Sequence, residues 1–359
     1  RLLMSAAGRG QAPSLQKTRH CFAVFAMTND KIRFFATEAQ NDKTLSLFPV
    51  SYSLFPVPRL NLIVQPHPVS SLKLEDRMIR IVTDSACDVP ENLAQEFGVI
   101  KVPTHIIWDG EDYLDSVTMT AGQFYQRLPD TDAIPTSSQP STGEFLAAYN
   151  QAAQEGASAI ICLTVSGKLS GTFDSASAAA KESPVPVRVV DTRSISMQQG
   201  FQVLAAARAV RLGASLQQVL DSIEKVRQKV IFSVGLPTLT NLARTGRLGP
   251  AFKLFSNVVI SVHPLVAVNS ETGKIDPVGL ARTKKTMLDK VFNHFKQKAG
   301  TGLKLHAAVM HGAASKEADY LTQRIQQELQ PVELILTPTG PVLGAHAGKG
   351  AVAIAGYYE

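Results

Sequence analysis

Four segments of the chain place hydroxyl, carboxylate or imidazole groups directly after hydrophobic runs. Residues 83–85 (Thr-Asp-Ser) follow the first such run, and residues 135–141 hold three consecutive hydroxyl side chains between two prolines, with a further serine after the second. Residues 166–172 contain Ser170 among small residues, and residues 340–351 surround a histidine with glycine and alanine. Hydroxyl groups and free backbone amides in such places can donate hydrogen bonds to an anion.

Each segment also has a simpler structural explanation. Residues 83–85 can form an Asp/Ser turn in which Asp88 caps the next helix. Residues 135–141 can form an ordinary Ser/Thr/Pro loop, and Ser170 can be a plain helix N-cap. Residues 340–351 can be a turn between two strands with a solvated histidine. A site therefore depends on whether the fold brings these segments together.

Several other chemistries lack support in the sequence. No phosphate-binding P-loop, dinucleotide fingerprint, nucleophile elbow, His-Glu-x-x-His zinc motif or kinase signature is present. His306 on a predicted strand and His311 at its exit lie five residues apart, so they face opposite sides, which argues against a shared metal ion. The acidic residues Asp109, Glu111, Asp112 and Asp115 are most simply a solvated loop. The three cysteines are far apart, which predicts neither disulfides nor a metal site and fits a reducing compartment.

Composition indicates a soluble globular protein. Of 359 residues, 45% are hydrophobic and 18% are charged. The net charge of +6 is concentrated in residues 1–77, which hold 10 Lys and Arg against 5 Asp and Glu, leaving 26 against 25 in residues 78–359. The nearly neutral body argues against nucleic-acid binding. No apolar run reaches the roughly 18 residues of a spanning helix, so stable membrane insertion is not expected.

Residues 1–77 are predicted to be a non-globular leader. They show no sustained helical or strand period, and the pentad Ser-Leu-Phe-Pro-Val occurs at both 46–50 and 53–57. The preferred interpretation is a disordered or misassigned upstream segment, because Met78 opens a clean strand pattern. A mobile tail and a targeting segment are the alternatives.

From Met78 onward, short β-branched runs alternate with amphipathic helices, which predicts an α/β fold with a mainly parallel sheet. We place a domain boundary near Gly235, giving domains of residues 78–235 and 236–359. The expected strands are 79–83, 99–108, 159–165, 187–191, 230–234, 305–310 and 332–337. The expected helices are 141–155, 173–181, 196–212, 216–229, 238–244 and one from Thr283, with a hairpin around 271–274 and a Gly-rich ending.

Taken together, the motifs of the body resemble the DegV family of fatty-acid-binding proteins. Seven segments occur in the family's order and at its spacing, and any single one would be a weak match. They are residues 83–85, 135–141, 169–172, 191–197, 246–248, 282–285 and 340–348.

The resemblance implies a bacterial, cytoplasmic protein of the EDD fold that is not itself an enzyme. Two α/β domains would enclose one long-chain fatty acid, such as palmitate, stearate or oleate, with its carboxylate held by hydroxyl groups and no other cofactor. A separate fatty-acid kinase subunit would be the partner that phosphorylates this carboxylate. The matching ligand-binding positions are Ser85, Thr136, Ser137, Ser170, Gly171, Thr172 and His346, and the matching partner or phosphate contacts are Arg247 and Arg282.

Two other functions remain open at this stage. The first is an enzyme, a serine hydrolase or an acyl phosphotransferase acting on a lipid, for which His346 is the only good candidate base. The second is a binding module for another carboxylate or an isoprenoid. The preferred chain length of a bound lipid would separate this last reading from fatty-acid binding.

Overall fold

The computed structural model describes residues 78–128, 135–247, 262–302 and 304–359 with their side chains, and the backbone of residues 22–28, 31–37 and 48–49. The chain forms two compact units, Arg1–Ser71 and Leu72–Glu359. In the first unit, β1 (Phe22–Thr28), β2 (Lys31–Thr37) and β3 (Phe48–Pro49) form an antiparallel sheet that the sequence did not lead us to expect. The rest of the predicted leader lies outside the described residues.

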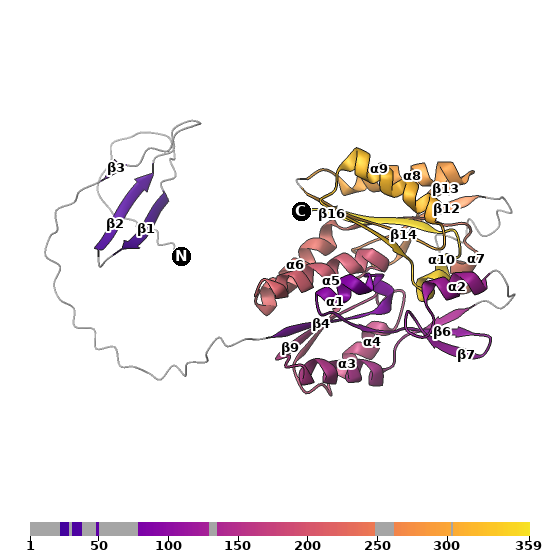
Figure 1. Ribbon diagram of the computed structural model, residues 1–359, viewed down its shortest axis with the longest axis horizontal. Coiled ribbons are helices and arrows are strands. Elements are labelled where there is room, and N and C mark those ends of the chain that lie inside the picture. Colours follow the sequence, from indigo (N-terminus) through magenta and orange to yellow (C-terminus); the bar gives the residue numbers. More distant parts are fainter. Residues whose placement is uncertain are drawn as a thin grey trace. The chain divides into compact units, whose positions relative to one another are not determined.

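The second unit begins with a four-stranded sheet in which every pairing is parallel, as predicted. Its strand order is β10-β9-β4-β5. The β-branched runs account for these strands, because alternate side chains pack on both faces of a buried sheet. The strands are β4 (Ile79–Asp84), β5 (Ile100–Val102), β9 (Ala159–Thr164) and β10 (Val187–Asp191), with α3 (Thr142–Gln154) and α4 (Thr172–Ala180) on one face (Figure 1).

The second sheet has six strands in the order β13-β12-β11-β16-β14-β15, and only β14 and β15 pair in parallel. Helices α8 and α9 cover its outer face (Figure 1). Its strands are β11 (Ile231–Gly235), β12 (His263–Val268), β13 (Ile275–Ala281), β14 (Leu305–His311), β15 (Glu333–Pro338) and β16 (Val352–Tyr358). The covering helices are α8 (Lys284–Ala299) and α9 (Ser315–Leu329).

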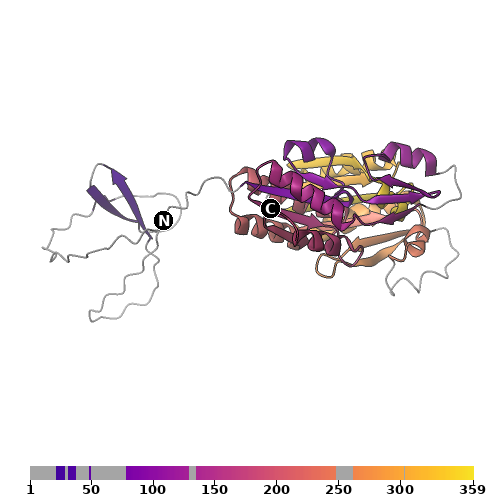
Figure 2. The ribbon, with the colours of Figure 1, turned by 90° about the horizontal axis from the view of Figure 1, so that it is seen from below.

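Helix α5 (Ser196–Arg211) lies between the two sheets, with α6 (Leu216–Lys229) beside it (Figures 1 and 2). Positions all around α5 are buried, because it packs on β4 and β9 on one side and on β16 on the other. A helix that is enclosed on every side in this way belongs to a core rather than to a surface. The largest hydrophobic cluster accordingly combines residues of α5 with residues of both sheets.

A smaller sheet, β7-β6-β8, completes this part of the chain. The single strand predicted over residues 99–108 is wrong: Pro103, which has no amide hydrogen, separates β5 from β6, and the two strands belong to different sheets. The strands are β6 (His105–Trp108), β7 (Glu111–Leu114) and β8 (Thr136–Ser138). The remaining helices are η1 (Ser85–Cys87), α1 (Glu91–Glu96), α2 (Ala121–Arg127), α7 (Thr240–Arg244) and α10 (Pro341–Ala347).

Two features differ from the expected order of elements. The strand predicted at 230–234, before the proposed boundary, pairs as β11 with β12 and β16, so it belongs to the second sheet. The Gly-rich ending is not a simple turn, because it forms α10 and then β16 in the middle of that sheet. The division into domains at Gly235 stays a prediction.

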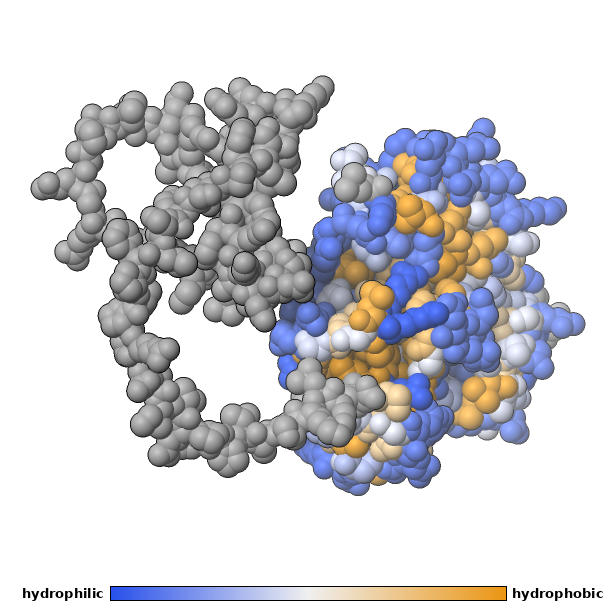
Figure 3. Space-filling model, turned by 60° about the vertical axis from the view of Figure 1, so that its left-hand side comes forward, coloured by the Kyte–Doolittle hydropathy of each residue, from blue (hydrophilic) through white to orange (hydrophobic). Residues whose placement is uncertain are grey.

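On the face that Figure 3 shows, hydrophilic residues surround hydrophobic patches near the middle of the face. Across the part of the chain that the structure describes, we find no helix with the length and apolar character needed to cross a membrane.

Candidate functional site

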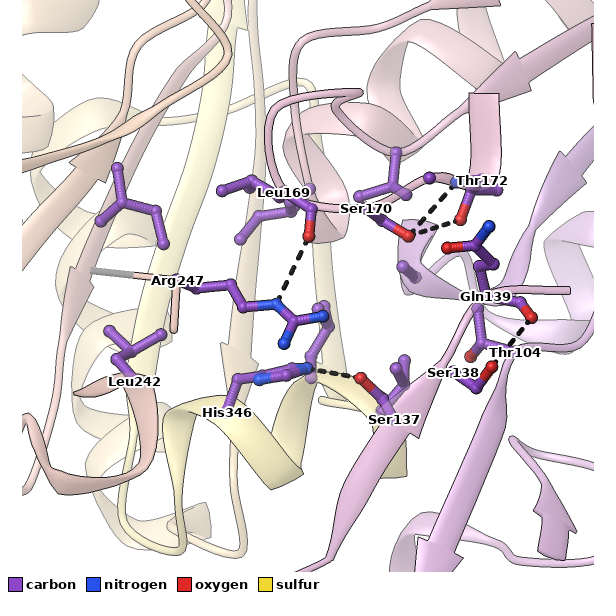
Figure 4. Close-up of a pocket in the computed structure, with 17 residues that line it drawn as sticks. Thr104, Ser137, Ser138, Gln139, Leu169, Ser170, Thr172, Leu242, Arg247 and His346 are labelled. Carbon is purple, nitrogen blue, oxygen red and sulfur yellow. Dashed lines mark hydrogen bonds between the residues drawn. The ribbon is translucent and has the colours of Figure 1, made fainter. Parts of the chain in front are cut away.

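A cavity of about 230 Å³ lies where the loops after β4 and β9 meet β8, α7, β13 and α10. We call it the hydroxyl cavity, because five hydroxyl side chains line it (Figure 4). Its position beyond the carboxyl ends of parallel strands is where open α/β sheets usually bind ligands. The hydroxyl residues are Thr104, Ser137, Ser138, Ser170 and Thr172, and the other lining residues are Ala86, Gln139, Val165, Leu169, Gly171, Ile195, Leu242, Arg247, Ile275, Val342, Leu343 and His346.

Ser137 and His346 form a direct contact across this cavity. Ser137 lies on β8, and its Oγ is 2.8 Å from Nε2 of His346 in the last turn of α10 (Figure 4). Burial lowers the pKa of His346 to about 4, and the positive charge of Arg247 acts in the same direction. The ring is therefore neutral near pH 7. Its Nδ1 is buried and has no hydrogen-bond partner among the described residues.

The contact between Ser137 and His346 fits either tautomer of the neutral ring. With its hydrogen on Nε2, the ring donates to Ser137 Oγ, and the Ser137 hydroxyl can then donate to a ligand in the cavity. With its hydrogen on Nδ1, Nε2 accepts the hydroxyl hydrogen of Ser137.

The loop between β9 and α4 supplies the second group of donors. Ser170 Oγ lies 2.8 Å from Thr172 Oγ1, and the Thr172 amide donates to Ser170 Oγ at 3.3 Å. Gly171 is the N-cap of the nine-residue helix α4 and contributes no side-chain cap of its own. A Cβ on Gly171 would lie 2.6 Å from Oε1 of Gln139, so a larger residue here would displace that exposed side chain. Hydroxyls at a helix N-terminus favour a bound anion.

Arg247 adds a positive charge to the same cavity. Its Nε donates to the carbonyl oxygen of Leu169 at 3.4 Å, and it also donates to the carbonyl of Thr245. The guanidinium extends into the cavity from the same side as His346 (Figure 4). A guanidinium at this position makes the cavity electrostatically suited to an anion.

A second, apolar cavity of about 70 Å³ adjoins the first. The two cavities share Ile195, Leu242, Ile275, Leu343 and His346. The remaining residues of the apolar cavity are Ser196, Phe232, Val234, Leu236, Val266, Val268, Met310, Thr339, Ala347, Ala351, Val352 and Ala353. A ligand that fills both cavities would therefore have a polar end and an apolar portion.

Three predicted site residues lie outside the lining of the hydroxyl cavity. Thr136 is exposed on β8 and does not line the cavity. Ser85 is buried behind the cavity: its hydroxyl lies 2.9 Å from Oγ1 of Thr104, and it accepts the Thr104 amide at 3.0 Å. Arg282 is exposed directly after β13. The structure brings together the other predicted residues: Ser137, Ser170, Gly171, Thr172, Arg247 and His346.

Sequence reasoning missed several lining residues. Gln139 and Ser138 lie within the segment 135–141, so the signal was present but only Thr136 and Ser137 were chosen. Thr104 gave no signal, because it was placed inside one continuous strand. The apolar lining residues are scattered along the chain and cannot be told from core residues in a sequence.

Three buried carboxylates lie near the hydroxyl cavity. The expectation that Asp115 belongs to a solvated loop is wrong, because it is 1% exposed. Burial raises the pKa of Asp84 to about 6, of Asp88 to about 7 and of Asp115 to about 6. Asp88 does not cap the following helix: its carboxylate accepts the amide of Gly340 at 2.9 Å.

Within the described residues, no three His, Cys, Asp or Glu side chains are arranged to hold a metal ion.

Comparison with known proteins agrees with this architecture. The DegV family model matches residues 78–359. A DegV domain-containing protein of Deinococcus radiodurans is 34% identical over 278 residues, which is 77% of this chain and 97% of the relative. A solved structure described as fatty acid binding of a DegV family protein from Thermus thermophilus is 31% identical, with a TM-score of 0.73 over 79% of this chain and 100% of that one. DegV of Bacillus subtilis, described as a fatty acid binding protein, is 26% identical, with a TM-score of 0.72 over 79% and 100% of the two chains. The chain belongs to the DegV family.

Proposed function

We propose that this protein binds one long-chain fatty acid, with its carboxylate in the hydroxyl cavity and its acyl chain in the apolar cavity. The proposal depends mainly on one observation: the hydroxyl cavity and the apolar cavity adjoin each other, and five residues line both. The fatty-acid-binding descriptions of the Thermus and Bacillus relatives support the same ligand class.

The carboxylate end is matched by neutral donors and one cation. Ser137, Ser170 and Thr172 would donate hydroxyl hydrogen bonds, each contributing about 1.5 to 3 kcal/mol because the acceptor is charged. Arg247 would offset the negative charge from the cavity wall. Neutral donors also leave the carboxylate oxygens reactive toward an incoming electrophile, which a tight arginine clamp would not.

The acyl chain supplies most of the binding free energy. Each buried methylene contributes about 0.8 kcal/mol, so a palmitate chain offers roughly 11 kcal/mol against an association cost of about 4 to 15 kcal/mol. Nearly the whole chain must therefore be enclosed. Lining residues such as Phe232, Val234 and Met310 are suited to this, because all three are buried in the core between the sheets.

The protein's role would be to carry and present the lipid rather than to transform it. A separate ATP-dependent kinase subunit is the partner that fits a carboxylate held by neutral donors. Arg247 is well placed to meet a transferred phosphoryl group, because it lines the hydroxyl cavity. Arg282 is exposed and could contact such a partner only from outside the cavity.

The direct test is native mass spectrometry of the full chain after purification, followed by solvent extraction of the bound molecule. We expect one C16 to C18 fatty acid per chain. The same preparation, stripped of lipid, should take up palmitate, stearate or oleate. A protein that is empty and takes up none of the three contradicts the proposal.

A serine hydrolase is the second candidate, because the 2.8 Å contact of Ser137 and His346 has the geometry of a nucleophile and its base. Two observations weaken it. The pKa of about 4 makes His346 a poor base at neutral pH, and Nδ1 has no orienting partner among the described residues. Rapid hydrolysis of p-nitrophenyl palmitate, abolished in His346→Ala, would favour the hydrolase.

A further inference from the structure

Asp88 connects two segments that line the cavities. Its Oδ1 accepts the amide of Gly340 at 2.9 Å, and its Oδ2 accepts the hydroxyl of Ser196 at 2.6 Å. Gly340 begins α10, the helix whose last turn carries His346. Ser196 is the first residue of α5 and lines the apolar cavity. One buried side chain thus fixes two elements that are distant from it in the sequence.

Helix α10 depends on such outside contacts for its placement. Its N-cap Gly340 has no side chain, and Pro341 at the first helical position has no amide hydrogen. The next amide, of Val342, donates to Oδ1 of Asp115 at 3.4 Å. A helix of seven residues gains little stability from its own hydrogen bonds, so these two carboxylates hold its beginning.

The charge of Asp88 costs stability at neutral pH. Burial raises the pKa of this carboxyl to about 7; the charge of Asp115 acts in the same direction and that of Lys101 opposes it. The folded protein therefore keeps a proton on Asp88 that the unfolded chain releases near pH 4. Its contribution to stability falls as pH rises from about 4 to about 7. A carboxylate retained at such a cost is typical of a functional position.

We propose that Asp88 is a positioning residue, which sets the placement of α10 relative to α5 and so holds His346 against Ser137. Asp88 is not among the lining residues of either cavity, so it acts through His346 rather than on the ligand. The inference rests on the proposed function, since the ligand at His346 is taken to be a fatty-acid carboxylate.

Two substitutions at Asp88 separate positioning from general stability. The residue has φ of 50°, a conformation that glycine and asparagine both adopt readily. Asp88→Gly removes both hydrogen bonds without adding backbone strain. Asp88→Asn keeps an oxygen acceptor for the Gly340 amide and a polar partner for Ser196, but removes the charge. Ser215→Ala is the matched control, because it removes the capping side chain of α6, which lines neither cavity.

The full chain is examined by two measurements. The first is the imidazole ¹⁵N resonances of His346 without ligand, assigned with His346→Gln. The second is the affinity for palmitate labelled with ¹³C at its carboxyl carbon. We expect Asp88→Gly to shift the His346 Nε2 resonance and to weaken palmitate binding by about tenfold or more. Asp88→Asn should bind within about threefold of wild type and melt at a higher temperature at pH 8. Ser215→Ala should lower the melting temperature but leave the His346 resonances and the palmitate affinity unchanged.

The inference is overturned if Asp88→Gly keeps the wild-type His346 resonances and palmitate affinity, or if Asp88→Asn is as impaired as Asp88→Gly. If Asp88→Gly does not fold, Ser196→Ala takes its place, because it removes one of the two hydrogen bonds; an unshifted His346 resonance would then overturn the inference. If wild type binds no palmitate but Asp88→Gly still shifts the His346 resonance, the proposed ligand fails and the positioning role stands.

Discussion

Ser137 is the side chain on which the hydroxyl cavity depends most. It lines the cavity, and its Oγ lies 2.8 Å from Nε2 of His346, which lines the same cavity. Thr136, the neighbouring residue on β8, is exposed and lines neither cavity. Adjacent hydroxyl residues of one strand therefore have different surroundings, which offers a matched pair of substitutions.

Ser137→Ala should weaken palmitate binding by about tenfold or more, because a charge-assisted hydrogen bond contributes about 1.5 to 3 kcal/mol. Isothermal titration of lipid-free protein measures the affinity. Thr136→Ala is the control and should bind as wild type does. Equal affinities of the two variants would mean that the carboxylate lies elsewhere.

His346 should give the folded protein a characteristic dependence on pH. Its pKa of about 4 in the folded state lies below the ordinary value of 6.5, so the unfolded chain takes up a proton that the folded protein does not. The free energy of unfolding should fall as pH falls from about 6.5 to about 4, by at most about 1.4 kcal/mol per pH unit from this residue.

Urea unfolding of lipid-free wild type and His346→Gln at several pH values isolates this contribution. The buried carboxylates act in the opposite direction over the same range, but they are present in both proteins. The stability of wild type relative to the variant should decrease toward acid pH. Parallel curves would contradict a neutral, buried His346.

The residue types of the site could be predicted from the sequence better than their directions. The segments that hold Ser137, Ser170, Thr172 and His346 stood out because hydroxyl and imidazole groups follow hydrophobic runs, and the resemblance to the DegV family indicated the individual residues. Which residues of β8 reach the cavity depends on how this strand pairs with β6, and no local pattern encodes that register.

At the scale of elements, the hairpin between β12 and β13 is held against the loops of the first sheet. Ser166, which is fully buried, donates its hydroxyl to the carbonyl of Gly273 at 2.7 Å. Arg193 donates to the carbonyl of Glu271 at 2.9 Å. Ile275, two residues beyond Gly273, lines both cavities. These hydrogen bonds therefore close one side of the binding region.

Gly273→Ala should destabilise the protein by at least about 1 kcal/mol more than Gly213→Ala does. Both glycines have positive φ, 71° and 75°, so the backbone cost is similar. A Cβ at Gly213 meets nothing within 4 Å, whereas at Gly273 it would lie 2.4 Å from Ser166 Oγ and displace this hydrogen bond. Urea unfolding measures both, and equal losses would show that the contact is dispensable.

Elements with their own sequence signals were predicted well. Helix α6 occupies residues 216–229 as expected, and α3 begins after Ser141 because a Ser-x-x-Glu capping box fixes its start. Helix α10 was missed, because its start is held by Asp88 and Asp115 rather than by a cap of its own. Contacts between residues so far apart leave no local pattern.

At the scale of the whole second unit, α5 joins the two large sheets into one core. Phe201 on α5 is fully buried, and its ring lies 5.5 Å from that of Tyr357 on β16. It belongs to a cluster that also includes Ile81 of β4. A helix shared by both sheets should make their unfolding cooperative.

Phe201→Ala should destabilise the protein by about 3 to 5 kcal/mol. Fluorescence of Trp108, the only tryptophan in the chain, and ellipticity at 222 nm should give the same lowered urea midpoint. Trp108 lies in a different hydrophobic cluster from Phe201. An equal decrease in both urea midpoints would therefore show that the two clusters unfold together. Leu212→Ala, at a position 86% exposed, should leave both midpoints unchanged. Separate midpoints would contradict the shared core.

The central place of β16 in the six-stranded sheet affects how the protein can be made. β16 pairs with β11 on one side and β14 on the other, and it follows both in the chain. During synthesis, β11 and β14 leave the ribosome without the strand that joins them, so both present open edges to other chains. The apolar cavity cannot be complete until Val352–Tyr358 has emerged, because Val352 and Ala353 line it, and we expect the nascent chain to need a chaperone until then.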